Sequence, residues 1–354
     1  MMPPKKLIFF LLFSMLLISF GFYAYQIVYT PNFLVGKEDR LIIIPNDANF
    51  KTVQKQLHEG DYVQDLMSFA FLARLMDYDK KVKSGRFVLK ANMTNLQAIR
   101  LLRLGKQEPV RITINNVRLL KELSEKITAN LGMRPDEFET AAVKFSMNNP
   151  YGFNKDNLMS MFIPNTYEVY YNISPDALME RMHKEYELFW NEERTAKAKT
   201  VGLTPVEVSI LASIVQAETV KQEEAPIIAG LYLNRLKQGM PLQADPTLVF
   251  ASGDFSLKRV LNEHKQIDSP YNTYKYPGLP PGPINMPRVN CIDAVLNYHA
   301  SNYLYMCAKE DFSGNHNFTD NYRTQINNAN RYQRALEIEI EKGKQLRKAA
   351  EKKK

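Results

Sequence analysis

One carboxylate in the chain has the setting that acid–base chemistry requires. Glu218 lies four residues after Ile214 and seven after Leu211, so the helical repeat places it on the face that these apolar residues share. A carboxylate on a buried face loses hydration, and this loss disfavours its charged form. Glu218 is therefore expected to hold a proton near neutral pH, as a general acid must. The alternative is a half-exposed Glu218 that pairs with Lys221 and has no catalytic role.

The helix that carries Glu218 has a readable beginning. Thr204 is a suitable N-cap, Pro205 fits the first helical position, and Glu207 completes a capping box. A second helix is predicted over 226–238, where Gly239 ends it. Both helices belong to the region that holds the candidate acid.

Two segments without a helical or strand pattern follow these helices, and the second is rich in Pro, Asn and Tyr. One covers 240–247, and the other contains six prolines from Pro270 to Pro287. Long loops in compact domains are usually functional or disordered, and the tyrosines of the second segment argue against disorder. A stiff backbone with amide, hydroxyl and aromatic side chains suits an amphipathic sugar polymer. A structural loop that packs over the core is the alternative.

The N-terminal segment predicts a membrane anchor. No charged residue lies between Leu7 and Gly36, and about 20 apolar residues span a bilayer, so a transmembrane helix is predicted over Leu7–Val28. The run ends in aromatic residues without a small-x-small cleavage site, which favours an uncleaved anchor over a cleaved signal peptide. Lys5 and Lys6 are expected to keep residues 1–6 in the cytoplasm, with the rest of the chain outside the inner, cytoplasmic membrane.

Composition indicates a folded protein and argues against a nucleic-acid partner. The chain is 45% hydrophobic, with 19 Phe and 19 Tyr, which can fill a core. The formal net charge is +8, but residues 341–354 supply +5 of it, so the remainder carries only about +3. This basic tail is interpreted as a solvated helix end or a disordered extension.

Metal and thiol chemistry have little support in the sequence. The five His residues are scattered, and the metal-binding, phosphate-binding and serine-nucleophile motifs are absent from the sequence. Cys291 and Cys307 are expected to be either a disulfide or two small buried thiols, and the pattern leaves both alternatives open.

The predicted organisation beyond the anchor has several parts. These are a linker at 29–40, a small α+β unit at 41–107, a mostly helical part at 108–200, a core that carries the candidate site at 201–335, and the basic tail at 336–354. Within 41–107, strands are predicted at 41–44 and 86–89 and helices at 46–59, 63–75 and 95–104. This unit is interpreted as a spacer or as a glycan-binding module.

A series of short motifs follows one another in a fixed order along the chain. They are Ala212–Val215 with Glu218, Asn234–Leu236, Gly239–Gln243 with Asp245–Thr247, Ser269–Tyr274, Gly278–Ile284, and Tyr303–Tyr305 followed by Gly314, His316 and Phe318. Together they resemble the endolytic murein transglycosylases of the MltG (YceG-like) type. Upstream, Pro164–Tyr167 is similar to the family's Pro-x-Thr-Tyr turn, and 41–107 resembles its LysM-like subdomain. The implied fold is α+β, with one transmembrane helix, a small LysM-like α+β subdomain and a larger α+β catalytic domain.

The resemblance implies a reaction and a set of site residues. The reaction is cleavage of the MurNAc–GlcNAc bond within peptidoglycan strands, which leaves 1,6-anhydro-MurNAc ends. Glu218 would protonate the leaving oxygen and then accept the proton of the sugar's C6 hydroxyl, whose intramolecular attack gains from proximity. The residues that would orient the glycan are Gln243, Asp245, Tyr271, Asn272 and Thr273. No cofactor or metal is needed, and peptidoglycan synthases are candidate partners.

The sequence also departs from the family pattern. The family commonly has Glu-x-Glu in this helix, whereas the chain has Gln216-Ala217-Glu218, so the first carboxylate is missing. Two rival functions are kept open. One is a non-catalytic peptidoglycan-binding scaffold protein, and the other is a hydrolase that uses Glu218 with Asp245 and leaves reducing ends.

Overall fold

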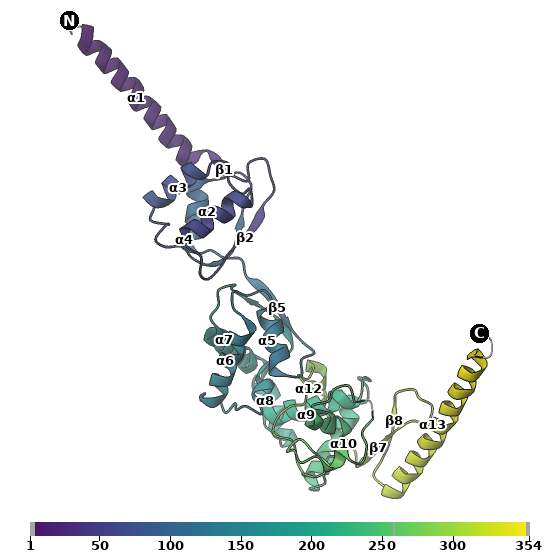
Figure 1. The fold of residues 1–354 in the computed structure, drawn as a ribbon. Coiled ribbons are helices and arrows are strands. Elements are labelled where there is room, and N and C mark those ends of the chain that lie inside the picture. The colour runs from purple at the N-terminus through teal and green to yellow at the C-terminus, as the bar shows by residue number, and fades with distance from the viewer. Residues whose placement is uncertain (1–3, 258, 352–354) are drawn as a thin grey trace. The chain divides into compact units, whose positions relative to one another are not determined.

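The computed structural model describes residues 4–257 and 259–351, and about half of the chain is helical (Figure 1). The described residues form four separate two-stranded sheets, so the predicted α+β class is confirmed. The first three residues of the predicted 1–6 segment and the last three of the predicted tail lie outside the described residues. The chain divides into two compact units. Unit 1 contains the residues up to Ile112, Ile127–Arg134 and Tyr167–Ser174, and unit 2 contains the remainder.

Unit 1 begins with the apolar helix α1 (Pro4–Tyr29), which covers the predicted transmembrane segment and leaves its large apolar side chains exposed. The elements that follow are β1 (Pro31–Phe33), β2 (Arg40–Ile44), α2 (Phe50–Glu59), α3 (Leu66–Leu75), β3 (Gly85–Leu89), β4 (Met93–Thr94) and α4 (Asn95–Leu104). Strand β1 pairs with β4 and β2 with β3, both antiparallel. Their inner faces and the helices bury a core that includes Phe33, Phe69 and Ile99.

Two helices of unit 1 begin later than predicted. Helix α2 begins at Phe50 because Asn49, not Asn46, is the N-cap, and its side chain accepts a hydrogen bond from the Thr52 N–H. Helix α3 begins at Leu66, three residues after the predicted start, because the Asp65 carboxylate accepts two backbone N–H groups of its first turn. The predicted helix over 95–104 is confirmed, with Gly105 left-handed at its C-cap.

Three elements contribute residues to both units. Strand β5 (Val110–Ile114), helix α5 (Leu120–Thr128) and strand β6 (Asn165–Val169) are divided between the units. The elements that belong wholly to unit 2 are α6 (Pro135–Met147), η1 (Leu158–Met161), α7 (Pro175–Phe189), α8 (Glu192–Val201), α9 (Pro205–Glu218), α10 (Ala225–Lys237), α11 (Asp245–Ser252), η2 (His264–Gln266), α12 (Val289–Leu296), β7 (Tyr305–Ala308), β8 (His316–Thr319) and α13 (Tyr322–Glu351).

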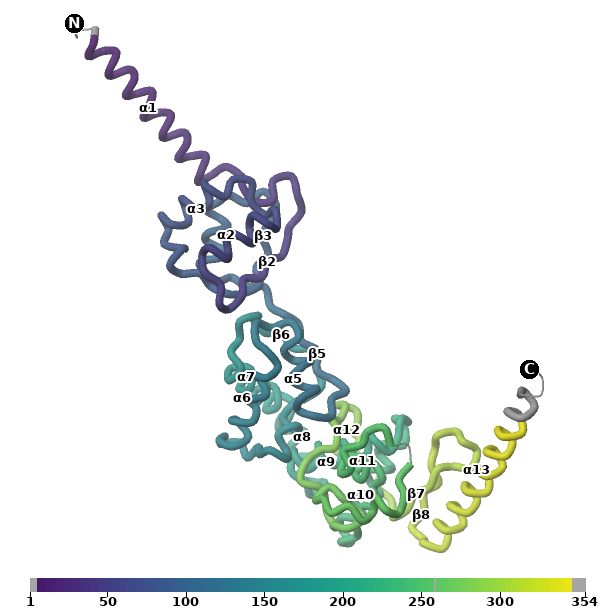
Figure 2. Tube along the Cα trace, viewed as in Figure 1, coloured from purple at the N-terminus to yellow at the C-terminus, as the bar shows by residue number. Residues whose placement is uncertain are grey.

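Helix α9 is the central helix of unit 2 (Figure 2). The capping box is confirmed, because the Glu207 carboxylate accepts the Thr204 N–H at 2.7 Å and the Thr204 hydroxyl accepts the Glu207 N–H at 3.3 Å. Every residue from Val208 to Val215 is buried, so α9 is enclosed on all sides rather than along one apolar stripe. Glu218 therefore stands where a core helix emerges from the core.

Two expectations for unit 2 need correction, and the structure decides between alternatives for the tail and the cysteines. The segment Pro164–Tyr167 is not a turn throughout, because Asn165 begins β6 and the β-branched Thr166 and the aromatic Tyr167 favour a strand. The segment 240–247 is not a loop throughout, because Asp245 begins α11. Pro246 fits the first turn of this helix because the N–H that proline lacks needs no partner there. The predicted tail begins inside α13, which agrees with its helical interpretation. Cys291 and Cys307 are free thiols, not a disulfide.

Candidate active site

Glu218 is the last residue of α9, and its side chain is half-buried. The Tyr232 hydroxyl, from the neighbouring helix α10, donates a hydrogen bond to Glu218 Oε1 at 2.8 Å. Tyr232 is only 2% exposed, so this donor is fixed by the core. The hydrogen-bond partner of Glu218 is thus a neutral phenol and not Lys221, the partner that the alternative interpretation requires.

The surroundings of Glu218 shift its pKa to about 7 from an ordinary value of 4.5. Burial is the largest cause and raises the pKa, the Tyr232 hydrogen bond lowers it, and the nearby charge of Asp245 raises it. The position at the C-terminal end of α9 also disfavours a negative charge. At neutral pH the carboxyl group is therefore poised both to give up a proton and, afterwards, to accept one.

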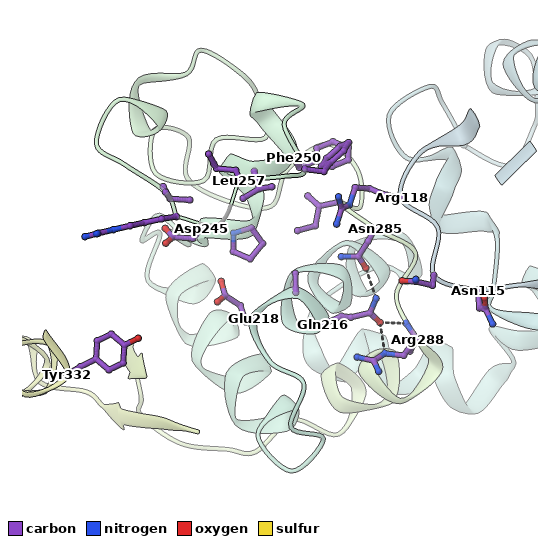
Figure 3. A pocket seen from close by; sticks show the side chains of 18 of the residues that line it. Asn115, Arg118, Gln216, Glu218, Asp245, Phe250, Leu257, Asn285, Arg288 and Tyr332 are labelled. Atoms are coloured by element: carbon purple, nitrogen blue, oxygen red, sulfur yellow. Dashed lines mark hydrogen bonds between the residues drawn. The ribbon is translucent and has the colours of Figure 1, made fainter. Parts of the chain in front are cut away.

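Two pockets of unit 2 meet at Glu218. The larger pocket has a volume of about 1190 Å³, and its lining includes Gln216, Glu218, Asp245, Asn285 and Arg288 (Figure 3). The smaller pocket, of about 400 Å³, is lined by Glu218 and Asp245 together with Tyr232, Gln243, Tyr274, Tyr305 and His316. A polymer that occupied both pockets would pass directly over the candidate acid.

Asp245 and Gln243 both lie at this junction, as the sequence suggests. Asp245 is the first residue of α11, and its exposed carboxylate accepts a hydrogen bond from the Tyr274 hydroxyl at 2.5 Å. Gln243 has a positive φ of 54° and an exposed side chain whose Oε1 accepts a hydrogen bond from Arg235 at 3.2 Å. The buried guanidinium of Arg235 also binds the carbonyls of Pro241 and Leu242, so it holds the turn that presents Gln243.

Asn272 lines neither pocket. It is fully buried, and its Nδ2 donates hydrogen bonds to the carbonyls of Lys265 at 3.0 Å and Ile267 at 2.8 Å. Its Oδ1 accepts the backbone N–H groups of Tyr274 and Lys275. Both the amide nitrogen and the amide oxygen of Asn272 are thus hydrogen-bonded to the backbone of its own loop. These bonds hold Tyr274 in place.

Thr273 and Tyr271 also face inward. The Thr273 hydroxyl accepts the Ala244 N–H at 3.1 Å and bonds the Thr247 hydroxyl at 2.8 Å, which fixes the start of α11 and so the position of Asp245. The Tyr271 ring lies against Phe250, with 4.6 Å between the ring centroids. Phe250 lines the larger pocket, so Tyr271 supports the pocket wall from behind.

Gln216 has a structural role that a carboxylate could not fill. Its Nε2 donates to Asn285 Oδ1 at 2.9 Å and to the Met286 carbonyl at 3.2 Å. Its Oε1 accepts the Arg288 N–H at 2.6 Å and Arg288 Nε–H at 3.1 Å (Figure 3). An ionised carboxylate has no hydrogen to donate, so it could not make the first two of these bonds. Gln216 therefore ties the loop after Gly278 to α9.

The sequence interpretation missed several residues of this site. Tyr232 is the most important, because its contact with Glu218 joins two helices and no local pattern marks it. Tyr274 lies within a segment that the sequence does single out, and the clustering of Tyr271, Tyr274 and Tyr276 there is the signal that could have identified it. Asn285 lies within the proline-rich segment and Arg288 directly follows it, and neither belongs to a motif that the sequence singles out.

Replacing Tyr232 with Phe is expected to change the pH profile of the site. The hydrogen bond from Tyr232 lowers the Glu218 pKa, so its loss should raise that pKa and move the alkaline limb of any Glu218-dependent activity to higher pH. The rate at the optimum should fall roughly tenfold to a hundredfold, because a bond to a charged group is worth about 1.5–3 kcal/mol. A pH series of initial rates checks this. An unshifted limb would mean that Tyr232 only fills space.

Comparison with known proteins identifies a family and several relatives that this chain resembles. A model of the YceG-like family matches residues 42–331. A protein of Streptococcus pneumoniae (strain ATCC BAA-255 / R6), named endolytic murein transglycosylase, is 27% identical over 336 residues, covering 84% of this chain and 60% of the relative. The chain thus spans less than two thirds of that relative's length. A protein of the same name from Bacillus subtilis (strain 168) is 43% identical over 101 residues, 28% of each chain.

A solved structure shares the fold. The crystal structure of a yceG-like protein from Listeria monocytogenes aligns with a TM-score of 0.51 and 22% identity, over 82% of this chain and 98% of that chain. At this identity the likeness concerns the fold alone. The family match, in contrast, covers both the helix that carries Glu218 and the loops that line its two pockets. The chain belongs to the YceG-like family.

Proposed function

We propose that the chain is a lytic transglycosylase that cleaves the MurNAc–GlcNAc bond within peptidoglycan strands and so limits the length of nascent strands. One observation carries the proposal: Glu218 has a pKa of about 7 and stands where two pockets meet. The names of the relatives from Streptococcus pneumoniae and Bacillus subtilis support the same activity.

In the proposed mechanism, Glu218 acts twice. The protonated carboxyl group gives its proton to the glycosidic oxygen as the bond to MurNAc C1 breaks, which releases the GlcNAc hydroxyl. The resulting carboxylate takes the proton of the MurNAc C6 hydroxyl as that oxygen bonds to C1. Water is not consumed, and Glu218 ends protonated as it began. A pKa near 7 serves both proton transfers.

Asp245 has a supporting role in this mechanism. Its charge raises the Glu218 pKa, which keeps the acid protonated before the reaction. As positive charge develops on the sugar ring, the carboxylate of Asp245 stabilises it. Gln243 contacts the glycan from the smaller pocket. Tyr271, Asn272 and Thr273, which the sequence interpretation assigns to glycan contact, act in this proposal through the loop that they hold.

A hydrolase is the second candidate, because Glu218 and Asp245 line the same two pockets. Replacing Asp245 with Asn separates the two mechanisms. With a single acid, the variant should keep measurable cleavage, reduced roughly a hundredfold, with anhydro ends on its products. If Asp245→Asn is folded but as inactive as Glu218→Gln, a second carboxylate is essential and hydrolysis is favoured.

The size distribution of the products tests whether cleavage occurs within strands. Purified full-length chain should convert long uncrosslinked strands into fragments of intermediate length from the start of the reaction, because substrate occupies both pockets. Chromatography of the strands over time measures this. Early release of disaccharides alone would mean an exo-acting enzyme, and tight binding without any shortening would favour the non-catalytic scaffold.

The proposal also assigns roles to the regions outside the site. Residues 41–107 form a LysM-like subdomain that binds glycan, and 108–200 and 201–335 together form the catalytic region. The apolar surface of α1 supports an anchor in the inner membrane, and α1 has the length to span it. Peptidoglycan synthases are the proposed protein partners.

The proposed topology places residues 1–6 in the cytoplasm and the body of the chain outside. Protease added to spheroplasts should therefore digest the body of the protein while the membrane retains α1. The matched control is the same digestion after lysis, which should also remove residues 1–6. A soluble mature form that begins after α1 would instead identify α1 as a cleaved signal sequence.

A further inference from the structure

Three arginines line the larger pocket without a carboxylate partner. Arg118, Arg259 and Arg288 all contribute to its lining, and none of them has an ion pair among the residues that the structure describes. The described acidic residues of the lining are Glu218 and Asp245, so three arginines face at most two carboxylates. The pocket therefore presents an excess of positive charge to whatever occupies it.

Neutral groups hold two of these arginines in place. The guanidinium of Arg118 lies over the Phe255 ring, 4.2 Å from its centroid. The Nε–H of Arg288 binds the Gln216 amide oxygen at 3.1 Å. A carboxylate at position 216 would pair with Arg288 and cancel its charge, whereas Gln216 leaves that charge available. Both guanidinium groups are thus positioned without being neutralised.

We propose that the larger pocket is a subsite for the peptide stem of the substrate and that Arg118, Arg259 and Arg288 bind its carboxylates. The proposal rests on the proposed function, because it takes peptidoglycan as the substrate. The sugar backbone offers hydroxyl and acetamido groups, whereas the stem peptide attached to MurNAc carries carboxylates. Guanidinium groups bind carboxylates through paired hydrogen bonds, which favours this part of the substrate.

Pocket size and lining agree with a peptide beside a sugar. The volume of about 1190 Å³ exceeds the roughly 300–1,000 Å³ of pockets that hold one small ligand. Part of the lining is apolar, with Val249, Phe250 and Leu257, which suits the methyl groups of the alanine residues in the stem. The smaller pocket, at about 400 Å³, has room for the sugar on the other side of Glu218.

Binding to strands with and without stems tests the proposal. The full-length chain carrying Glu218→Gln is used, so that cleavage does not interfere. Two samples of uncrosslinked strands are compared, one with stems and one from which an amidase has removed the stems. Neither sample carries a lipid diphosphate, because that anion would also bind arginines. Strands with stems should bind roughly tenfold more tightly or better, and amidation of the stem carboxylates should remove most of that preference.

The arginine variants show whether this pocket causes the preference. Arg118→Gln, added to Glu218→Gln, should reduce severalfold or more the ratio of the affinity for strands with stems to the affinity for strands without them. Arg259→Gln is the second variant, because Arg259 is exposed and its replacement should leave the fold unchanged. Arg181→Gln, on α7 and outside both pockets, removes the same charge and should leave the ratio as it was.

The outcomes are decisive even if the proposed reaction fails. Loss of the preference in the Arg118 and Arg259 variants supports the subsite whether or not the wild type cleaves strands. Equal affinity for strands with and without stems would overturn it, as would a preference that amidation or the arginine variants leave unchanged. Absence of cleavage by the wild type on both strands would count against the proposed function alone.

Discussion

Replacing Glu218 with Gln should reduce strand cleavage by roughly a thousandfold or more. The amide keeps the shape of the side chain but cannot give or accept the proton, and general acid–base catalysis alone contributes about 10²- to 10⁴-fold. Affinity for strands should remain near that of the wild type, because the substitution leaves the pocket walls in place. Initial rates of fragment release by purified full-length protein measure the effect.

A matched control accompanies this variant. Glu223→Gln removes an exposed carboxylate from the segment that follows α9, and it should retain wild-type activity. The assignment is wrong if Glu218→Gln releases products at the wild-type rate while Glu223→Gln behaves as expected.

Glu218→Gln also has a consequence for stability that does not depend on activity. The Glu218 pKa rises from 4.5 to about 7 on folding, so the folded state binds the proton more tightly than the unfolded state. The contribution of Glu218 to the free energy of unfolding is therefore most favourable below about pH 4.5 and is lost as the pH rises through 7. Relative to the wild type, Glu218→Gln should gain stability between pH 5 and pH 8, as thermal unfolding at both pH values would show. A difference in unfolding temperature between the variant and the wild type that is the same at both pH values would contradict the raised Glu218 pKa.

Replacing Asn272 with Ala should destabilise unit 2 by roughly 2–4 kcal/mol, since several buried backbone groups lose their partners. Four backbone groups, two carbonyls and two N–H groups, bind the Asn272 side chain in the wild type. The loop also carries Tyr274, whose hydroxyl holds Asp245, so activity should fall by roughly one to two orders of magnitude. Product ends should remain chemically unchanged.

Thermal unfolding and strand binding distinguish the possible roles of Asn272. The control is Asn290→Ala, an exposed asparagine on α12, which should change neither stability nor activity. A folded Asn272→Ala protein with unchanged stability and weakened glycan binding would instead show that Asn272 contacts the substrate directly.

Local interactions explain why much of the scaffold was predictable. The capping box of Thr204 and Glu207 joins residues three positions apart, and the apolar residues that follow at helical spacing indicate a helix packed against the core. Both features belong to one helix, so the start of α9 and the position of Glu218 follow from the sequence. Helix α11 was harder to predict, because the residues that begin it, Asp245 and Pro246, are equally common in turns.

The partners within the site depend on contacts that the sequence does not encode locally. Tyr232 meets Glu218 only because α9 and α10 pack together. The residue type of Asn272 suits both glycan binding and loop support, and burial alone distinguishes them. For Gln216, the substitution of an acid by an amide was readable, but its four hydrogen bonds require the loop around Asn285 to be in place.

The chemistry of the new strand ends is the most direct test of the proposed reaction. Purified full-length protein is incubated with uncrosslinked peptidoglycan strands, and the fragments are analysed by mass spectrometry. Intramolecular attack by the C6 hydroxyl predicts 1,6-anhydro-MurNAc ends, each lighter by one water than a reducing end, and none of these products with Glu218→Gln. Reducing MurNAc ends would contradict the account, because they would show that water, not the sugar's own hydroxyl, attacks the bond.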